Sequence, residues 1–142
     1  MIVPALTVLL EDGRRSYEPN DELIVEYRLD STAHIEAKAM EASVVWYTIG
    51  KGDEDFGVHH FVRHAADEGS LLDCRKPQRL RTILPRSPLS YDGAIVKIRW
   101  CVRVRLFPTR GREMIMEVPF RLGHIPAVHV EEVKPLSPDD VD

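Results

Sequence analysis

The residues most capable of chemistry form a basic row near position 100. Lys97, Arg99, Arg103 and Arg105 alternate with apolar residues on either side of Cys101. Because successive side chains of a β-strand point to opposite faces, these four cations would share one face. Such a row can bind an acidic protein surface, a phosphorylated peptide or nucleic acid, or it can be the hydrated face of a strand.

Nucleic acid is the least favoured of these partners, and no nucleic-acid binding is expected. The chain carries 23 acidic and 19 basic residues, which gives a net charge of −4. No aromatic residue interleaves with the cations on their own face of the strand, as base stacking would require. The row is therefore interpreted as a hydrated sheet face, with a protein partner as the functional alternative.

His59, His60 and His64 form a second group. In an extended strand, His60 and His64 share one face, and Asp67 could supply a third metal ligand. The spacing matches no established zinc signature, so these residues are weak metal candidates. A ligand- or metal-binding sandwich, with or without catalytic activity, is the alternative to an interaction domain.

No residues show a catalytic pattern. Ser87 and Ser90 lie in a turn whose sequence is unlike a nucleophile elbow, and the chain has no glycine-rich phosphate loop. Paired acids in the C-terminal tail have no rigid surroundings to hold them. We therefore predict a protein that is not an enzyme and needs no cofactor.

The cysteines and the N-terminal residues bear on the cellular compartment. Cys74 and Cys101 are the only cysteines, too few for a disulfide framework, so both are interpreted as free thiols of a cytoplasmic protein. One disulfide is the alternative. The apolar start of the chain lacks a preceding basic region and is broken by Pro4, so neither a signal peptide nor a membrane span is expected.

Apolar residues recur mostly at every second position, which is typical of strands. Strands are expected at residues 3–10, 22–29, 39–50, 57–64, 71–83 with interruptions, 94–107 and 112–122. Seven or more such strands predict an all-β fold, an immunoglobulin-like β-sandwich of two antiparallel sheets. A closed barrel is the alternative fold. Residues 1–125 would form this domain, and residues 126–142 a partly flexible tail.

The long strand from residue 94 to 107 would face the core with its even-numbered side chains. Trp100 belongs to that set, and Trp46 occupies the apolar phase of another strand, so both are expected in the core. Pairing with the following strand depends on the turn length. A five-residue connection would place Arg103 opposite Glu117, and a three-residue connection would place Arg105 opposite Glu113.

Three segments, in order along the chain, resemble the arrestin family. The segment "YEPNDELIVEYRL" resembles the family pattern in which an aromatic residue and a turn lead into the second strand. Tyr17, Pro19 and Glu22 occupy the matching positions. "LPRSPLSYDGAIVKIRWCVRVRL" resembles a Leu-Pro-x-Ser turn, a glycine and a long strand, beginning at Leu84 and Pro85, and "EMIMEVPFRL" resembles the closing strand. Ser87 and Gly93 complete the second segment. The resemblance covers residues 3–122, one arrestin N-terminal-type half.

The resemblance implies a non-enzymatic protein-binding scaffold or adaptor. It also implies that such a half can form a homodimer, because the family buries one end of this sandwich against a second one. The chain also departs from the family pattern, and receptor-phosphate sensing is therefore not expected of it. Asn20 and Asp21 replace the usual glycine of the first turn, and the first strand lacks the lysine pair with which receptor-binding arrestins sense phosphate.

Overall fold

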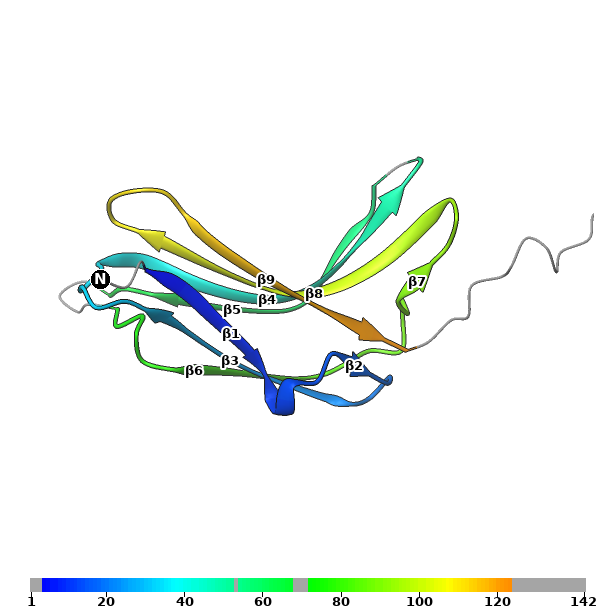
Figure 1. Ribbon diagram of the computed structural model, residues 1–142, viewed down its shortest axis with the longest axis horizontal. Coiled ribbons are helices and arrows are strands. Elements are labelled where there is room, and N and C mark those ends of the chain that lie inside the picture. The colour runs from blue at the N-terminus through cyan, green and yellow to red at the C-terminus, as the bar shows by residue number, and fades with distance from the viewer. Residues whose placement is uncertain (1–3, 53, 68–71, 124–142) are drawn as a thin grey trace, which may run out of the picture.

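The polypeptide folds into two β-sheets that pack face to face (Figure 1). The computed structural model describes residues 4–52, 54–67 and 72–123. In chain order the elements are β1 (Ala5–Leu10), a 3-10 turn η1 (Glu11–Gly13), β2 (Ser16–Tyr17), β3 (Glu22–Asp30), β4 (Ala37–Gly50), β5 (Phe56–Ala65), β6 (Gln78–Ile83), β7 (Tyr91–Asp92), β8 (Val96–Pro108) and β9 (Met114–Leu122). The prediction of a two-sheet sandwich is confirmed.

The smaller sheet has the antiparallel order β1-β3-β6. The larger sheet has six strands, in the order β2-β9-β8-β4-β5, and the short β7 also pairs with β8. Its long strands are antiparallel, whereas β2 joins β9 in parallel. β8 therefore lies inside the larger sheet, between β4 and β9, and this position places the basic row in the middle of a sheet face.

Alternate side chains of both sheets fill the space between them, as the pattern of every second residue predicted. The following core residues of β3 and β8 are at most 1% exposed: Leu23, Val25, Tyr27, Leu29, Trp100, Val102, Val104 and Leu106. Trp46 is half-buried and packs against this core. Burial of these apolar side chains supplies the main free energy that holds the sheets together.

The C-terminal end of β4 and the N-terminal end of β8 bend away from the smaller sheet (Figure 1). β4 and β8 have 14 and 13 residues and pair over almost their whole length, from Ala37 with Pro108 to Gly50 with Val96. Because the bent end diverges from the second sheet, Val96 remains 36% exposed. The expectation that every even-numbered residue from 94 onward faces the core is wrong at this end.

The segment expected as an interrupted strand from residue 71 to 83 is a strand only from Gln78. Residues 74–76 turn instead, and the Leu29 N–H donates to the Cys74 carbonyl at 2.7 Å. Pro77 has no N–H for a ladder, so regular pairing begins after it. Leu71 and the predicted tail lie outside the described residues. Within the described ranges no helix has the length and apolar character that crossing a bilayer requires.

The first two segments of the arrestin resemblance contact each other. The Asn20 N–H donates to the Leu84 carbonyl at 3.0 Å, and the Leu84 N–H donates to the Asp21 carbonyl at 2.9 Å. Asn20 has a φ of +71°. Asparagine adopts this left-handed conformation more readily than other residues with a side chain, which explains how it replaces glycine in the turn.

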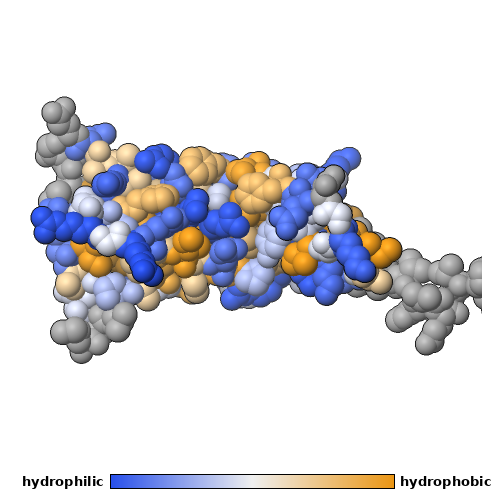
Figure 2. Space-filling model, turned by 90° about the horizontal axis from the view of Figure 1, so that it is seen from above, coloured by the Kyte–Doolittle hydropathy of each residue, from blue (hydrophilic) through white to orange (hydrophobic). Residues whose placement is uncertain are grey.

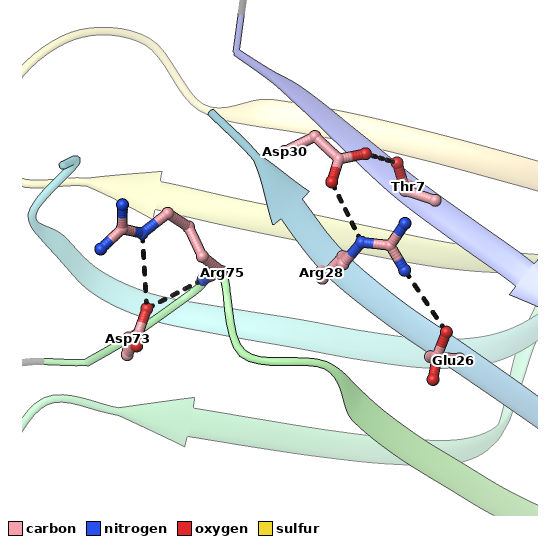
Figure 3. A network of polar contacts seen from close by, with 6 residues as sticks. All are labelled: Thr7, Glu26, Arg28, Asp30, Asp73 and Arg75. Carbon is pink, nitrogen blue, oxygen red and sulfur yellow. Dashed lines mark hydrogen bonds and ion pairs between the residues drawn. The ribbon is translucent and has the colours of Figure 1, made fainter. Parts of the chain in front are cut away.

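A polar network joins β1 to β3 on the outer side of the smaller sheet (Figure 3). Arg28 forms ion pairs with Asp30 at 3.0 Å and with Glu26 at 3.4 Å, and Asp30 also accepts a hydrogen bond from the Thr7 hydroxyl. The hydrogen bonds from Thr7 and then Arg28 hold the pKa of Asp30 below its ordinary value. The network leaves Arg28 engaged by its own neighbours.

Candidate functional site

The basic row lies on the outer face of the larger sheet, the face that points away from the smaller sheet. On this face, residues of neighbouring strands line up in rungs. Two rungs, running from β5 through β4 and β8 to β9, consist of Phe61, Ser43, Arg103 and Glu117, and of Arg63, Glu41, Arg105 and Ile115. The strand order thus brings side chains from four segments beside the basic row.

The outer face is concave, because both ends of the larger sheet bend away from the smaller one (Figure 1). Figure 2 looks onto this face and shows hydrophilic and hydrophobic side chains intermixed rather than one charged patch. A concave, mixed surface of this kind offers both apolar contact and hydrogen bonds to a bound protein.

Each arginine of the basic row has an acidic neighbour. The ion pairs join Arg99 to Asp92 at 2.5 Å, Arg103 to Glu117 at 3.6 Å, and Arg105 to Glu113 at 2.6 Å. Arg103 lies directly opposite Glu117, so the register of the five-residue connection is confirmed. Arg105 reaches Glu113 from the neighbouring rung. Pairs at such partly exposed positions contribute only about 0.2 to 1 kcal/mol each.

Lys97 differs from the three arginines. It is exposed and lies opposite Ile49 of β4 and Asp92 of β7. Asp92 instead pairs with Arg99 and, at 3.1 Å, with Arg121. Among the ion pairs between described residues, none includes Lys97, so its ammonium group is the cation of the row most available to a partner.

Apolar side chains from β5 extend the outer face beside the basic row. Phe56, Val58 and Phe61 are 52%, 54% and 52% exposed. The Arg103 guanidinium lies over the Phe56 ring, 5.6 Å from its centroid, within cation–π range. No aromatic residue interleaves with the cations on the outer face of β8, as the sequence indicated. Phe107 at the end of the row does lie near the Arg105 guanidinium, 5.9 Å from its ring centroid, and β5 supplies further aromatic residues to the same face.

The sequence interpretation missed Asp92, Phe56 and Phe61 as parts of this face. β7 has only two residues, too few to show alternation, so nothing in the sequence placed Asp92 beside Arg99. The alternation of Phe56 and Val58 was a usable signal for an apolar outer side of β5. Its position next to the arginines depends on the strand order, which the pattern did not give.

Cys101 belongs to the same face but is only 2% exposed. Its Sγ donates a hydrogen bond to a Glu117 carboxylate oxygen at 3.5 Å. Burial, together with the nearby negative charge of Glu117, raises the pKa of the Cys101 thiol to about 12. A thiol kept neutral is a poor nucleophile, so Cys101 does not provide reactive chemistry here. Both cysteines are free, as the sequence indicated, and the structure buries both.

The three candidate metal-binding histidines lie on β5. His60 and His64 pair with Val44 and Met40, which confirms that they share one face. His64 Nε2 lies 2.7 Å from the Tyr27 hydroxyl of the opposite sheet.

His59 makes a second contact with the smaller sheet, through β6. Its Nε2 lies 2.8 Å from the Ile83 carbonyl oxygen and 3.0 Å from the Thr82 hydroxyl. In the part of the chain that the structure describes, no three His, Cys, Asp or Glu side chains are grouped to hold a metal ion. The geometry assigns His59 and His64 to contacts between the sheets.

Comparison with known proteins defines the fold. Neither a protein-family model nor a curated protein sequence matches the chain. Among solved structures, the chain is similar to Spo0M, a sporulation control protein from Bacillus subtilis, with a TM-score of 0.62 and 11% sequence identity. The likeness covers 88% of this chain and 51% of Spo0M, so the chain spans about half of that protein. This chain has an arrestin-like β-sandwich fold.

Proposed function

We propose that the chain is a non-enzymatic protein-interaction domain of the scaffold or adaptor type. Its partner would bind across the outer face of the larger sheet and contact Lys97, Arg99, Arg103 and Arg105. One observation carries this proposal: half-exposed aromatic side chains lie beside arginines on a sheet face that no further layer of the described residues covers. Arginine and aromatic residues are the types enriched at the centres of protein interfaces.

The charges of this face favour a protein partner over a polyanion. Asp92, Glu113 and Glu117 lie among the cations and would repel a continuous row of phosphates. A protein surface can instead match the mixture of charged and apolar side chains on this face. Its carboxylates would lie at Lys97 and beside the exposed parts of the arginines, and its apolar groups would lie at Phe56 and Phe61. The ion pairs already hold the arginines in place, which reduces the entropy lost on binding.

The likeness to Spo0M supports a regulatory rather than catalytic role. That protein is a sporulation control protein, and its fold is shared over most of this chain. Fold alone does not determine function, so the assignment depends on the outer face. The test is therefore directed at that face.

The experiment compares two charge reversals that replace the same number of arginines. Arg99→Glu with Arg103→Glu changes the outer face, whereas Arg79→Glu with Arg81→Glu changes two exposed arginines on β6 of the smaller sheet. Each protein is used to capture partners from extracts of its source organism, and captured proteins are quantified by mass spectrometry. We expect the outer-face variant to lose the specific partner by about tenfold or more, and the β6 variant to retain it.

Equal capture by both variants, with folding confirmed by circular dichroism, would contradict the proposed site. Loss of capture with the β6 variant alone would move the binding surface to the smaller sheet. A second measurement uses a photo-crosslinking amino acid at Lys97, which is exposed and unpaired among the described residues. The crosslinked partner should be the protein that the outer-face variant loses.

A further inference from the structure

β5 is the last strand on its side of the larger sheet. Among the described residues it pairs only with β4, and it presents ten residues at the edge. An uncovered edge of this length is a template for another strand, and proteins often protect such edges with lysines or prolines. β5 contains neither, and its outward side chains Phe56, Val58 and Phe61 are half-exposed.

The backbone groups that face the free edge can be identified from the ladder with β4. The Thr48 N–H donates to the Asp55 carbonyl at 3.0 Å, and the Ala66 N–H donates to the Lys38 carbonyl at 3.1 Å. Backbone groups of successive residues point to alternate sides of a strand. At the two ends of β5, the backbone groups of Asp55 and Ala66 therefore face β4, and those of Phe56 and Ala65 face the free edge.

A bulge in β5 joins these two alternations. Val44 pairs with His60 and Val45 with Val58, so His59 is the extra residue. Both His59 and His60 then face β4, as the two residues of such a bulge do. The residues whose N–H and C=O groups face the free edge are therefore Phe56, Val58, Phe61, Arg63 and Ala65, and these also carry the side chains of the outer face.

We propose that β5 pairs antiparallel with β5 of a second copy of this chain, across a two-fold axis between His59 and His60. In this register Val58 lies opposite Phe61 of the second copy, and Phe56 opposite Arg63. Every edge-facing residue from 56 to 63 then meets another edge-facing residue. The two bulges lie opposite each other. Each bulge shifts the alternation of edge-facing residues by one position, so the shift in one strand is matched by the shift in the other.

The same register matches the side chains. Val58 and Phe61 of both copies form a central apolar cluster of four residues on the outer face, and such cross-strand pairs stabilise sheets. Each Phe56 ring lies beside the Arg63 guanidinium of the second copy, a pairing that permits cation–π contact. Arg63 keeps its own ion pair with Glu41, so the two copies do not bring unpaired like charges together.

Other registers satisfy only part of the strand. A register shifted by two residues pairs Val58 with Arg63. It then sets Phe61, whose backbone groups face the free edge, opposite His60, whose backbone groups face β4. Registers centred on Gly57 or Val62 use only one side of the bulge. Self-pairing thus has one register of full length, which is why a second copy, rather than an arbitrary peptide, is the occupant that β5 fits. The dimer would join two concave outer faces along one edge.

The test combines two double variants that change charge at the central pair. One carries Val58→Glu and Phe61→Glu, and the other carries Val58→Lys and Phe61→Lys. In the proposed register each places like charges opposite each other in a homodimer, whereas a mixture places Glu opposite Lys. We expect wild-type protein to reach twice the 16.2 kDa chain mass in sedimentation equilibrium, and each variant alone to associate on the order of 100-fold more weakly. The mixture should regain the dimer.

The control is Leu9→Glu on β1, an edge strand of the smaller sheet, where Leu9 is 51% exposed. This variant should dimerise like wild type. Wild-type protein that keeps the single-chain mass up to its solubility limit would overturn the proposal. Variants that dimerise as wild type does, or a mixture that regains no dimer although both variants fold by circular dichroism, would also overturn it.

Discussion

Cys101 lies on the outer face between Val45 and Pro119 of the neighbouring strands, yet it is almost fully buried. Burial first, and then the Glu117 charge, raise the pKa of its thiol to about 12. The folded protein therefore favours the neutral thiol more than the unfolded chain does. The resulting stabilisation is complete below the unfolded pKa, near 8.5, and is lost as pH rises toward 12.

Replacing Cys101 with alanine should flatten the alkaline dependence of stability. Between pH 7 and pH 10 the unfolded thiol ionises while the folded one does not, which costs the wild-type protein about 1.5 to 2 kcal/mol of unfolding free energy. Cys101→Ala lacks this loss, even if its stability at pH 7 is lower. Urea unfolding at both pH values gives the two differences. Equal differences in the two proteins would contradict the assignment of a neutral buried thiol.

At the scale of the elements, the sequence predicted alternation well and boundaries less well. The apolar phase of β8 identified Trp100, Val102, Val104 and Leu106 as core, and the parity argument predicted Arg103 opposite Glu117. Prediction from alternation failed where one part of a strand lacks the covering sheet, or where a strand is very short. The bent end of β8 lacks a second layer, and the two-residue strands β2 and β7 are too short to show a period.

Gly57 shows how one residue of β5 is required by the strand beside it. It lies opposite Trp46, and a Cβ built on Gly57 would lie 2.2 Å from the indole Nε1. Gly57→Ala should therefore lower the unfolding free energy by about 1 to 3 kcal/mol, because the indole or the strand must shift. Thermal unfolding measures this loss.

A Trp46→Leu background provides the control, since the smaller side chain removes the contact. Adding Gly57→Ala to it should cost less than adding the same change to wild type. Equal costs in both backgrounds would show that Gly57 matters for backbone reasons alone.

For the whole molecule, the sheet order decides which predicted residues meet. The sequence indicated a sandwich, its core faces and the basic row, because these depend on local alternation. It did not place the β5 aromatics beside the arginines, nor the histidines against Tyr27 and Ile83. Those contacts join residues far apart in the chain, and their formation depends on how the two sheets are ordered and packed.

The side of the sandwich formed by β5 and β6 is closed by polar contacts as well as by the core. His64 meets the buried Tyr27 hydroxyl at 2.7 Å, and His59 meets both Thr82 and the Ile83 carbonyl. A carbonyl only accepts, so His59 Nε2 carries the proton in that contact. Tyr27 has no second partner among the described hydrogen bonds, and burial raises the pKa of its hydroxyl to about 12.

These two contacts should differ in their cost of removal. Tyr27→Phe leaves His64 Nε2 without its partner at the sheet interface, and should lower the unfolding free energy by about 1 to 2 kcal/mol. Thr82→Val should cost less, about 0.5 kcal/mol, because His59 keeps the Ile83 carbonyl. Urea unfolding of both variants and of their combination measures each cost and their additivity. A larger cost for Thr82→Val would mean that the hydroxyl, rather than the carbonyl, is the main partner of His59.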